Sequence, residues 1–390
     1  MSLPALQPLQ LAGLELKNRF VKTATYEGLS PEGRVSDGLI AHHADQARHG
    51  VALTTVAYAA VHPSGRTFAD QLLVTPDAGL DRIADAVHAA GGRVSLQLSH
   101  CGGFSKHRAG GRPMGPSFSL NAYGLAYGLP FVRAMTRADM TETAQAYAEA
   151  AAVAVDAGVD ALELHCGHGY LLSQFLSPAI NRRRDDYGGS LDNRLRFPLE
   201  VVHAVRARVG EAVPLLAKIN LHDGIRGATG DEALPIAQAL VEAGVDAIVP
   251  SGGLVQRSAF YLLRGEVPLG DMVRAEASWL QRISMRLLGP FLVRRFPYSS
   301  SFFREQARAL VAAVDAPVGL LGGVDSAAAV REALELGFSF VVMGRALLAD
   351  PDFIERMAAG EDVVSRCTHC NQCVARMDQG VACVLDLPEP

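Results

Sequence analysis

Residues 163–197 read ELHCGHGYLLSQFLSPAINRRRDDYGGSLDNRLRF. The stretch begins where an apolar run ends, and it places His165, His168 and Tyr170 within six residues. Imidazoles can donate hydrogen bonds to a carbonyl oxygen, and a phenol can supply a proton. A lone histidine on an apolar segment is usually a satisfied core residue. Two histidines and a tyrosine beside glycines instead predict a catalytic site where a strand ends.

Eight short apolar runs recur along the chain, separated by helical segments. Most lack polar alternation, as expected of parallel strands that are buried on both faces. Helix signals lie between them, including a capping box at 136–139 and a helix-to-strand step that occurs at both 157–161 and 243–247. This alternation predicts an α/β fold, a (β/α)8 TIM barrel, with a doubly wound sheet as the alternative. The runs are 19–24, 51–56, 93–98, 159–164, 215–220, 245–250, 317–321 and 338–343.

In such a barrel the active site lies at the carboxyl ends of the strands, and a phosphate site is common after strands seven and eight. Glycines there let backbone N–H groups approach a phosphate, and an arginine can clamp it. The residues in these positions are Gly322, Gly323, Gly344 and Arg345. We therefore expect them to form an anion site.

Two stretches interrupt the alternation. Residues 109–132 are rich in Gly, Pro, Ser and Tyr and predict a loop or small hairpin over the barrel mouth. Residues 255–303 form an insertion that contains the only tryptophan, Trp279. We expect a capping insertion, with a wall of the substrate pocket or an oligomer contact as further interpretations. The expected division is a barrel over 1–365 and a Cys-rich carboxyl-terminal segment over 366–390.

Composition excludes several classes of protein. The chain has 390 residues, of which 49% are hydrophobic, and a net charge of -5, which gives no sign of a nucleic-acid partner. The amino terminus has no basic, apolar leader, and no run reaches the roughly 18 apolar residues of a membrane-spanning helix. These features predict a cytoplasmic protein with no membrane partner. The sequence leaves open whether it forms a homo-oligomer.

Four cysteines are crowded near the carboxyl end. Their spacing is C-x2-C-x2-C-x9-C, and three thiolates at such a spacing can wrap one metal centre while a fourth completes its ligands. A metal site is therefore one interpretation, and an unmetallated segment is another. The cysteines are Cys367, Cys370, Cys373 and Cys383.

Residues 163–197, called the central block from here on, contain QFLSP at 174–178 and DYGGS at 186–190. This block resembles the signature of the old yellow enzyme family of NAD(P)H-dependent flavin oxidoreductases. The branch is the one shared by 2,4-dienoyl-CoA reductase and trimethylamine dehydrogenase. The resemblance implies bound FMN, NAD(P)H as hydride donor and a small-molecule enone as substrate. It implies that His165 and His168 bind the substrate carbonyl and that Tyr170 supplies the proton. In these relatives the cysteines hold a 4Fe-4S cluster; zinc is the other candidate here.

The same resemblance assigns the flavin contacts. The stretch from Thr23 through Ala24 and Thr25 stands where relatives lay small residues along the isoalloxazine, and Gln97 stands where they pair with its pyrimidine edge. Lys218 replaces an arginine near flavin N1, and the glycines named above with Arg345 resemble the FMN phosphate site. Trimethylamine dehydrogenase has a flavin-bonded cysteine where this chain has a tyrosine, which implies non-covalent FMN.

Three hypotheses of function follow. The leading one is an FMN-dependent ene-reductase that uses NAD(P)H to reduce the C=C bond of α,β-unsaturated carbonyl compounds. The second is an amine or N-demethylating flavin dehydrogenase that passes electrons through a carboxyl-terminal iron-sulfur cluster. The third is a non-catalytic flavin redox sensor. Tyr170 and the two histidines favour carbonyl reduction, whereas the cysteine spacing favours the second hypothesis.

Overall fold

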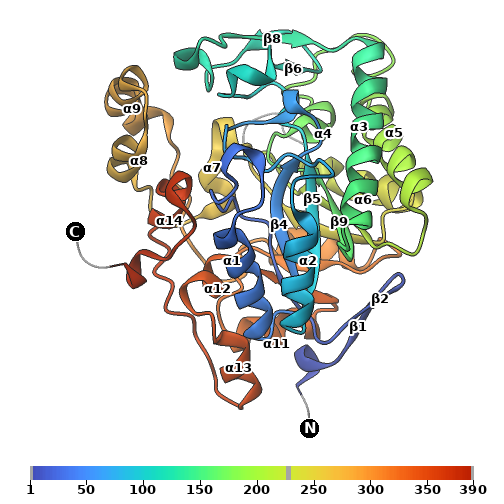
Figure 1. Cartoon of the computed structure of the whole chain (residues 1–390), viewed down its shortest axis with the longest axis vertical. Coiled ribbons are helices and arrows are strands. Elements are labelled where there is room, and N and C mark those ends of the chain that lie inside the picture. The colour runs from blue at the N-terminus through green and yellow to red at the C-terminus, as the bar shows by residue number, and fades with distance from the viewer. Residues whose placement is uncertain (1–2, 225–229, 388–390) are drawn as a thin grey trace.

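The eight apolar runs form the eight strands of one parallel sheet in the computed structural model, which describes residues 3–224 and 230–387 (Figure 1). Six of the strands are buried along their whole length, as the missing polar alternation predicts. The strands are β3 (Phe20–Lys22), β4 (Leu53–Ala60), β5 (Arg93–Ser99), β9 (Ala161–Cys166), β10 (Leu215–Asn220), β11 (Ala247–Ser251), β12 (Gly319–Leu321) and β13 (Phe340–Met343).

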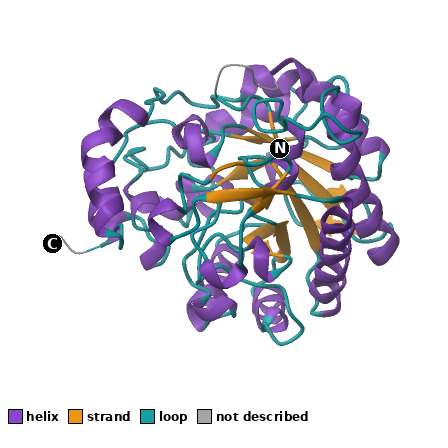
Figure 2. Cartoon of the chain, turned by 90° about the horizontal axis from the view of Figure 1, so that it is seen from above, coloured by secondary structure: helices purple, strands orange, loops and turns teal. Residues whose placement is uncertain are grey.

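The sheet closes on itself. Its order is β11-β10-β9-β5-β4-β3-β13-β12, and an isolated parallel bridge from Ile248 to Val318 joins the first and last strands. Helices surround the strands in the view from above (Figure 2). The predicted (β/α)8 barrel is therefore confirmed, and the doubly wound alternative is excluded, because a doubly wound sheet has open edges.

Helices follow the strands and cover the outside of the barrel. The predicted capping box begins α3: Thr136 Oγ1 accepts from the Asp139 backbone N–H at 3.2 Å, and the Asp139 carboxylate accepts from the Thr136 N–H at 2.6 Å. The helices are α1 (Asp37–Arg48), α2 (Leu80–Ala89), α3 (Arg137–Asp156), α4 (Leu171–Leu176), α5 (Leu191–Val209), α6 (Ala233–Glu242), α10 (Arg304–Val311), α11 (Ala327–Glu335), α12 (Arg345–Ala349) and α13 (Phe353–Ala358). A hairpin of β1 (Leu9–Leu11) and β2 (Leu14–Leu16) precedes the barrel. Among the described residues, no helix is long and apolar enough to span a membrane.

The two interruptions predicted from the sequence meet beside the barrel. Between β5 and α3, a small sheet comprises β6 (Met114–Gly115), β7 (Ser119–Leu120) and β8 (Phe131–Ala134). The later insertion forms α7 (Val255–Leu263), α8 (Leu269–Ala275) and α9 (Trp279–Leu292), of which α8 and α9 project from the barrel (Figure 1). Glu276 of this insertion connects it to the segment between β5 and α3, since its carboxylate accepts hydrogen bonds from Lys106 Nζ at 2.8 Å and from the Tyr127 hydroxyl.

The carboxyl-terminal segment, which contains α14 (Gln372–Ala375), packs back against the barrel. The Val381 N–H donates to the Glu27 carbonyl at 2.8 Å. Gly28 has a φ of 63°, and a Cβ there would lie 1.9 Å from the Met377 carbonyl oxygen. The loop after β3 and this segment are thus in direct contact. The division between 1–365 and 366–390 remains a proposal, and residues 1–2 and 388–390 of it lie outside the described residues.

We expect Gly28→Ala to loosen the carboxyl-terminal segment, because backbone atoms cannot retreat from a Cβ at that distance. Trypsin should then cleave after the exposed Arg376 faster than in the parent protein. Gly38→Ala is the control, since Gly38 lies in α1 and its nearest neighbour would be 3.5 Å from the new Cβ. Equal cleavage rates in the two variants would contradict the close contact.

Candidate active site

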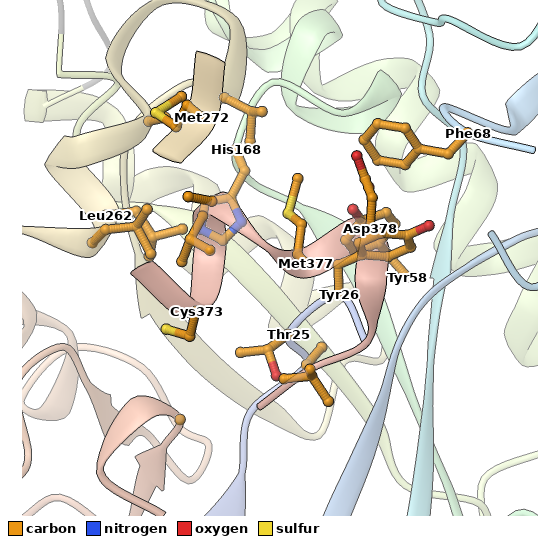
Figure 3. Close-up of a pocket in the computed structure, with 18 of the residues that line it drawn as sticks. Thr25, Tyr26, Tyr58, Phe68, His168, Leu262, Met272, Cys373, Met377 and Asp378 are labelled. Atoms are coloured by element: carbon orange, nitrogen blue, oxygen red, sulfur yellow. The ribbon is translucent and has the colours of Figure 1, made fainter. Parts of the chain in front are cut away.

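The structure brings together the three residues that the central block predicts. The rings of His165 and Tyr170 are stacked with centroids 4.1 Å apart, and His168 meets His165 edge-on at 4.9 Å. All three side chains are buried and line a cavity of about 330 Å³ at the barrel mouth. His168 and Tyr58 lie on its wall together with Met377 of the carboxyl-terminal segment (Figure 3).

His168 is held by the neighbouring strands. Its backbone has a φ of 59°, a left-handed conformation that histidine tolerates better than most residues. The backbone N–H donates to Asn220 Oδ1 at 2.9 Å, and Nε2 lies 2.7 Å from Ser251 Oγ. These partners sit at the ends of β10 and β11, and neither was predicted from the sequence. The ends of three adjacent strands therefore fix one imidazole.

Both histidines are neutral at physiological pH. Burial, with Lys218 adding to it, lowers the pKa of His168 to about 3. Burial, His168 and Lys218 hold the pKa of His165 well below its usual value. Within the described chain, the buried Nδ1 of His165 has no hydrogen-bond partner. The pair can therefore present uncharged donors to an oxygen in the cavity.

Tyr170 keeps its proton. Burial raises its pKa far above the usual value, despite hydrogen bonding with Tyr58. Burial and Tyr170 likewise raise the pKa of Tyr58. The Tyr170 ring also packs against Tyr58, with centroids 5.1 Å apart, and edge-on against Phe104 at 5.0 Å. A fixed, protonated phenol beside two imidazoles is the arrangement that a general acid requires.

A buried polar network lies below the cavity. Glu163 Oε1 accepts from Gln97 Nε2 at 2.6 Å and from Lys218 Nζ at 2.9 Å. Lys218 Nζ also donates to Thr23 Oγ1 at 3.0 Å. Of these side chains, Gln97 lines the cavity, whereas Lys218 is 1% exposed and does not line it. Lys218 lies in the run 215–220, which the sequence predicts to be a buried strand, but Glu163 was not identified as its counter-ion.

A second buried ion pair adjoins the first. Lys22 Nζ, which also lines the cavity, donates to Glu27 Oε1 at 2.9 Å, and His43 Nε2 lies 3.5 Å from the same oxygen. Burial opposes ionisation, but Lys22 and His43 hold the pKa of Glu27 down to about 2. This cluster was not predicted from the sequence. The signal that could have revealed it is Lys22, a charged residue in β3, the short first strand of the barrel.

The predicted anion site forms a smaller cavity of about 110 Å³. Gly323 has a φ of 81°, and a Cβ there would lie 2.9 Å from the Ser299 carbonyl oxygen; a Cβ on Gly344 would lie 3.0 Å from Thr23 Cγ2. Arg345 lines both cavities, but its guanidinium donates to the carbonyls of Leu263 and Arg264. All four residues predicted for this site, Gly322, Gly323, Gly344 and Arg345, line the smaller cavity. Thr23, Ala24 and Thr25, which were predicted to lie along the isoalloxazine, line it as well.

The smaller cavity also contains a carboxylate, that of Asp325. Tyr298 and Ser300 donate hydrogen bonds to it, and His369 Nε2 lies 3.4 Å from it. Although burial opposes ionisation, these partners lower the pKa of Asp325. Its negative charge is therefore compensated by its own neighbours. An anion bound in this cavity would rely on the backbone of the glycines and on Arg345.

The insertion and the carboxyl-terminal segment complete the wall of the main cavity. Met272 of α8 and Met377 line it (Figure 3), and so do Gln281 and Met285 of α9. The insertion is thus both a cap and a wall of the pocket, as two of the three interpretations of the sequence expect. Nothing in the structure tests the third, an oligomer contact.

The four carboxyl-terminal cysteines are free and partly exposed. Burial raises the pKa of Cys373 to about 11 against the effect of Arg345, and the thiols of Cys367, Cys370 and Cys383 add to the shift. The four thiols are therefore neighbours. Across residues 3–224 and 230–387, however, no group of three or more His, Cys, Asp or Glu side chains is arranged to hold a metal ion. A metal at these cysteines stays a proposal.

Comparison with known proteins identifies the class. Residues 5–250 match the model of the NADH:flavin oxidoreductase / NADH oxidase family. The chain is 41% identical over 386 residues to 4,4'-dithiodibutanoate disulfide reductase of Rhodococcus erythropolis, covering 97% of this chain and 94% of that protein. It is 30% identical over 376 residues to NADH oxidase of Thermoanaerobacter brockii, covering 93% of this chain but only 52% of that protein.

Structural comparison agrees. The old yellow enzyme homologue from Zymomonas mobilis superimposes with a TM-score of 0.72 at 19% identity, covering 94% of this chain and 95% of that one. This likeness supports the fold. Together with the family match and the 41% identical relative, it establishes that the chain belongs to the NADH:flavin oxidoreductase / NADH oxidase family, the old yellow enzyme family that the central block resembles.

The cofactor of this family is FMN, and NADH or NADPH supplies its electrons. The residues present fit that cofactor. The two cavities share Ala24, Thr25, Gly344 and Arg345, so one elongated ligand can occupy both. The larger cavity presents the unpartnered His165 Nδ1, and the smaller one is bounded by glycines whose Cβ atoms would meet neighbouring backbone or side chains.

The buried neutral histidines predict a loss of stability in mild acid. In an unfolded chain they take up protons near pH 6.5, whereas burial lowers the pKa of both His100 and His168 to about 3 in the folded protein. The unfolded state binds more protons between these values, so the free energy of unfolding falls as pH drops below 6.5, by up to about 1.4 kcal/mol per pH unit for each group.

Thermal unfolding between pH 7.5 and 5 measures this effect. His100→Asn should flatten the dependence, since an asparagine oxygen can accept the Gly102 N–H that now donates to His100 Nδ1 at 3.0 Å. The exposed His203→Asn should leave it unchanged. A melting temperature that stays constant over this range would show that these histidines take up protons as readily in the folded protein as in the unfolded chain.

Proposed function

We propose that the chain is an NAD(P)H-dependent ene-reductase that reduces the C=C bond of α,β-unsaturated carbonyl compounds. The observation that carries this proposal is the cluster of His165, His168 and Tyr170, in which two neutral imidazoles and one protonated phenol line a single buried cavity. Amine oxidation does not call for a carbonyl-binding pair next to a proton donor. We also propose that the protein acts in the cytoplasm.

Each residue has a distinct task in this proposal. His165 and His168 donate to the carbonyl oxygen of the substrate and so make the β-carbon electrophilic. Bound FMN would supply the hydride for that carbon, with NAD(P)H as its source. Tyr170 delivers the proton to the α-carbon. The aromatic walls exclude water, which strengthens the hydrogen bonds to the oxygen.

The cofactor contacts are proposed from the same geometry. Gln97, which lines the cavity, would contact the polar edge of the flavin ring, and Lys218, buried beside it on the shared partner Glu163, would stabilise the charge that reduction adds. The ring would lie along Ala24 and Thr25. Its phosphate would rest on Gly323 and the other backbone groups of the smaller cavity.

Tyr170→Phe should slow reoxidation by cyclohexenone about 10²–10⁴-fold, because the α-carbon loses its acid. Reduction by NAD(P)H needs no protein acid and should stay nearly intact. Stopped-flow absorbance measures the two half-reactions separately. Tyr123→Phe is the matched control, since it removes another phenol, partly buried, from the same cavity. Reoxidation at the parent rate in the Tyr170 variant would exclude Tyr170 as the donor.

Replacing His165 and His168 together by alanine should weaken the binding of a phenolate-forming ligand above the flavin. Each donor contributes roughly 1–3 kcal/mol when buried, so its loss weakens binding about 5- to 150-fold. The long-wavelength charge-transfer band of such a complex gives the titration. If the titration of the double variant equals that of the parent, the histidines do not face the flavin.

A second candidate is reductive cleavage of a dialkyl disulfide. It is favoured by the 41% identity to a disulfide reductase along nearly the whole length of both chains. The balanced reaction consumes one disulfide, one NAD(P)H and one proton and releases two thiols. Here the histidines would stabilise the leaving thiolate and Tyr170 would protonate it. Parallel assays with cyclohexenone and 4,4'-dithiodibutanoate rank the two candidates by kcat/KM.

The amine dehydrogenase hypothesis depends on the cysteines. It requires a cluster at Cys367, Cys370, Cys373 and Cys383 that accepts electrons. Iron, sulfide and zinc analysis of anaerobically purified protein, with Cys370→Ser as a metal-free control, tests this directly. Four irons per chain, together with oxidation of a methylated amine and no turnover of enones or disulfides, would replace the ene-reductase proposal.

A further inference from the structure

Helix α9 presents an apolar face that no described residue covers. Trp279, Ile283, Leu287 and Phe291 recur every four residues and form one stripe along its 14 residues. The exposed fractions of the large apolar side chains on this helix run from 47% to 85%. Its opposite side is anchored, because Gly289 is buried against Leu269 of α8. A monomeric protein rarely leaves so large an apolar surface in water. The side chains are Trp279, Leu280, Ile283, Leu287, Leu288, Phe291 and Leu292.

The charge around this face is all of one sign. Four exposed arginines, at 282, 286, 294 and 295, accompany it, and residues 277–303 contain no aspartate or glutamate. None of these arginines forms an ion pair with another described residue. The whole chain has a net charge of -5, so this segment is positively charged within a protein that is negatively charged overall.

We propose that α9 docks the protein on an anionic lipid surface, with the helix lying in the plane of the interface. This departs from the expectation of no membrane partner, which rested on the absence of a helix that could span a bilayer. A helix with Trp, Leu and Phe on one face and arginines beside them has the composition of interfacial helices. A second copy fits less well, because two-fold packing of α9 on itself would bring arginines only against arginines. At 14 residues, the helix is too short to span a bilayer.

Docking would also place the cavity at the interface. Gln281 and Met285, on the inner side of the same helix, line the main cavity. The lipid would then contact one side of α9 while the cavity lies on the other side. Only the thickness of this helix would separate them. An apolar small molecule dissolved in the membrane would then have a short path to the cavity.

The experiment uses purified holoprotein and vesicles of phosphatidylcholine with and without phosphatidylglycerol. Trp279 is the only tryptophan and is 61% exposed, so its emission reports on α9 alone. With anionic vesicles we expect a blue shift and flotation with the lipid, both lost at high salt. Replacing Arg282 and Arg286 by glutamine should weaken partitioning roughly fivefold per arginine.

Leu287→Glu combined with Phe291→Glu should abolish binding, whereas Val364→Glu, at an equally exposed apolar position outside α9, should not. Unchanged FMN content and melting temperature show that both variants fold. Equal binding to neutral vesicles, or none to anionic ones, overturns the proposal. A dimer in lipid-free solution that Leu287→Glu converts to monomer also overturns it and identifies a second copy as the occupant.

Discussion

The carboxylate of Glu163 is the constraint on which the interior of the barrel depends. It accepts hydrogen bonds from Gln97 on β5 and Lys218 on β10, and Lys218 reaches Thr23 beyond β3. An unpaired ammonium at 1% exposure would be strongly destabilising, so the network must be complete for the chain to fold. His165 follows two residues after Glu163 and so points to the same side of the strand. The network thereby fixes the position of His165 at the cavity.

Charged side chains lie close to the neutral donors of the cavity. Lys218 and Glu163 form a buried ion pair that does not line the cavity, whereas Lys22, the partner of Glu27, lines it together with the uncharged imidazoles and phenols. Lys218 also helps to keep His165 and His168 neutral, since a nearby cation disfavours imidazolium. A buried charge thus tunes the two imidazoles without lining the cavity itself.

The sequence predicts the strands well because a strand that is buried on both faces is an apolar run without polar alternation. The expected run 215–220, for example, coincides with β10. It also predicts the cluster of His165, His168 and Tyr170, since these residues are neighbours in the chain. It does not predict Glu163 as the partner of Lys218, because that contact depends on the register between two strands. Nor does it show that Met377, far along the chain, closes the cavity.

The left-handed backbone at His168 restricts what can replace it. A φ of 59° strongly disfavours β-branched and bulky side chains, while glycine and asparagine adopt it readily. Glycine would lose the hydrogen-bonding group, so asparagine is the substitution that keeps both the turn and a donor. A mutant library aimed at changing substrate range should therefore hold this position to His or Asn. The library should instead vary Met272, Gln281 and Met285, because these three cavity residues lie in helices, where most side chains are tolerated.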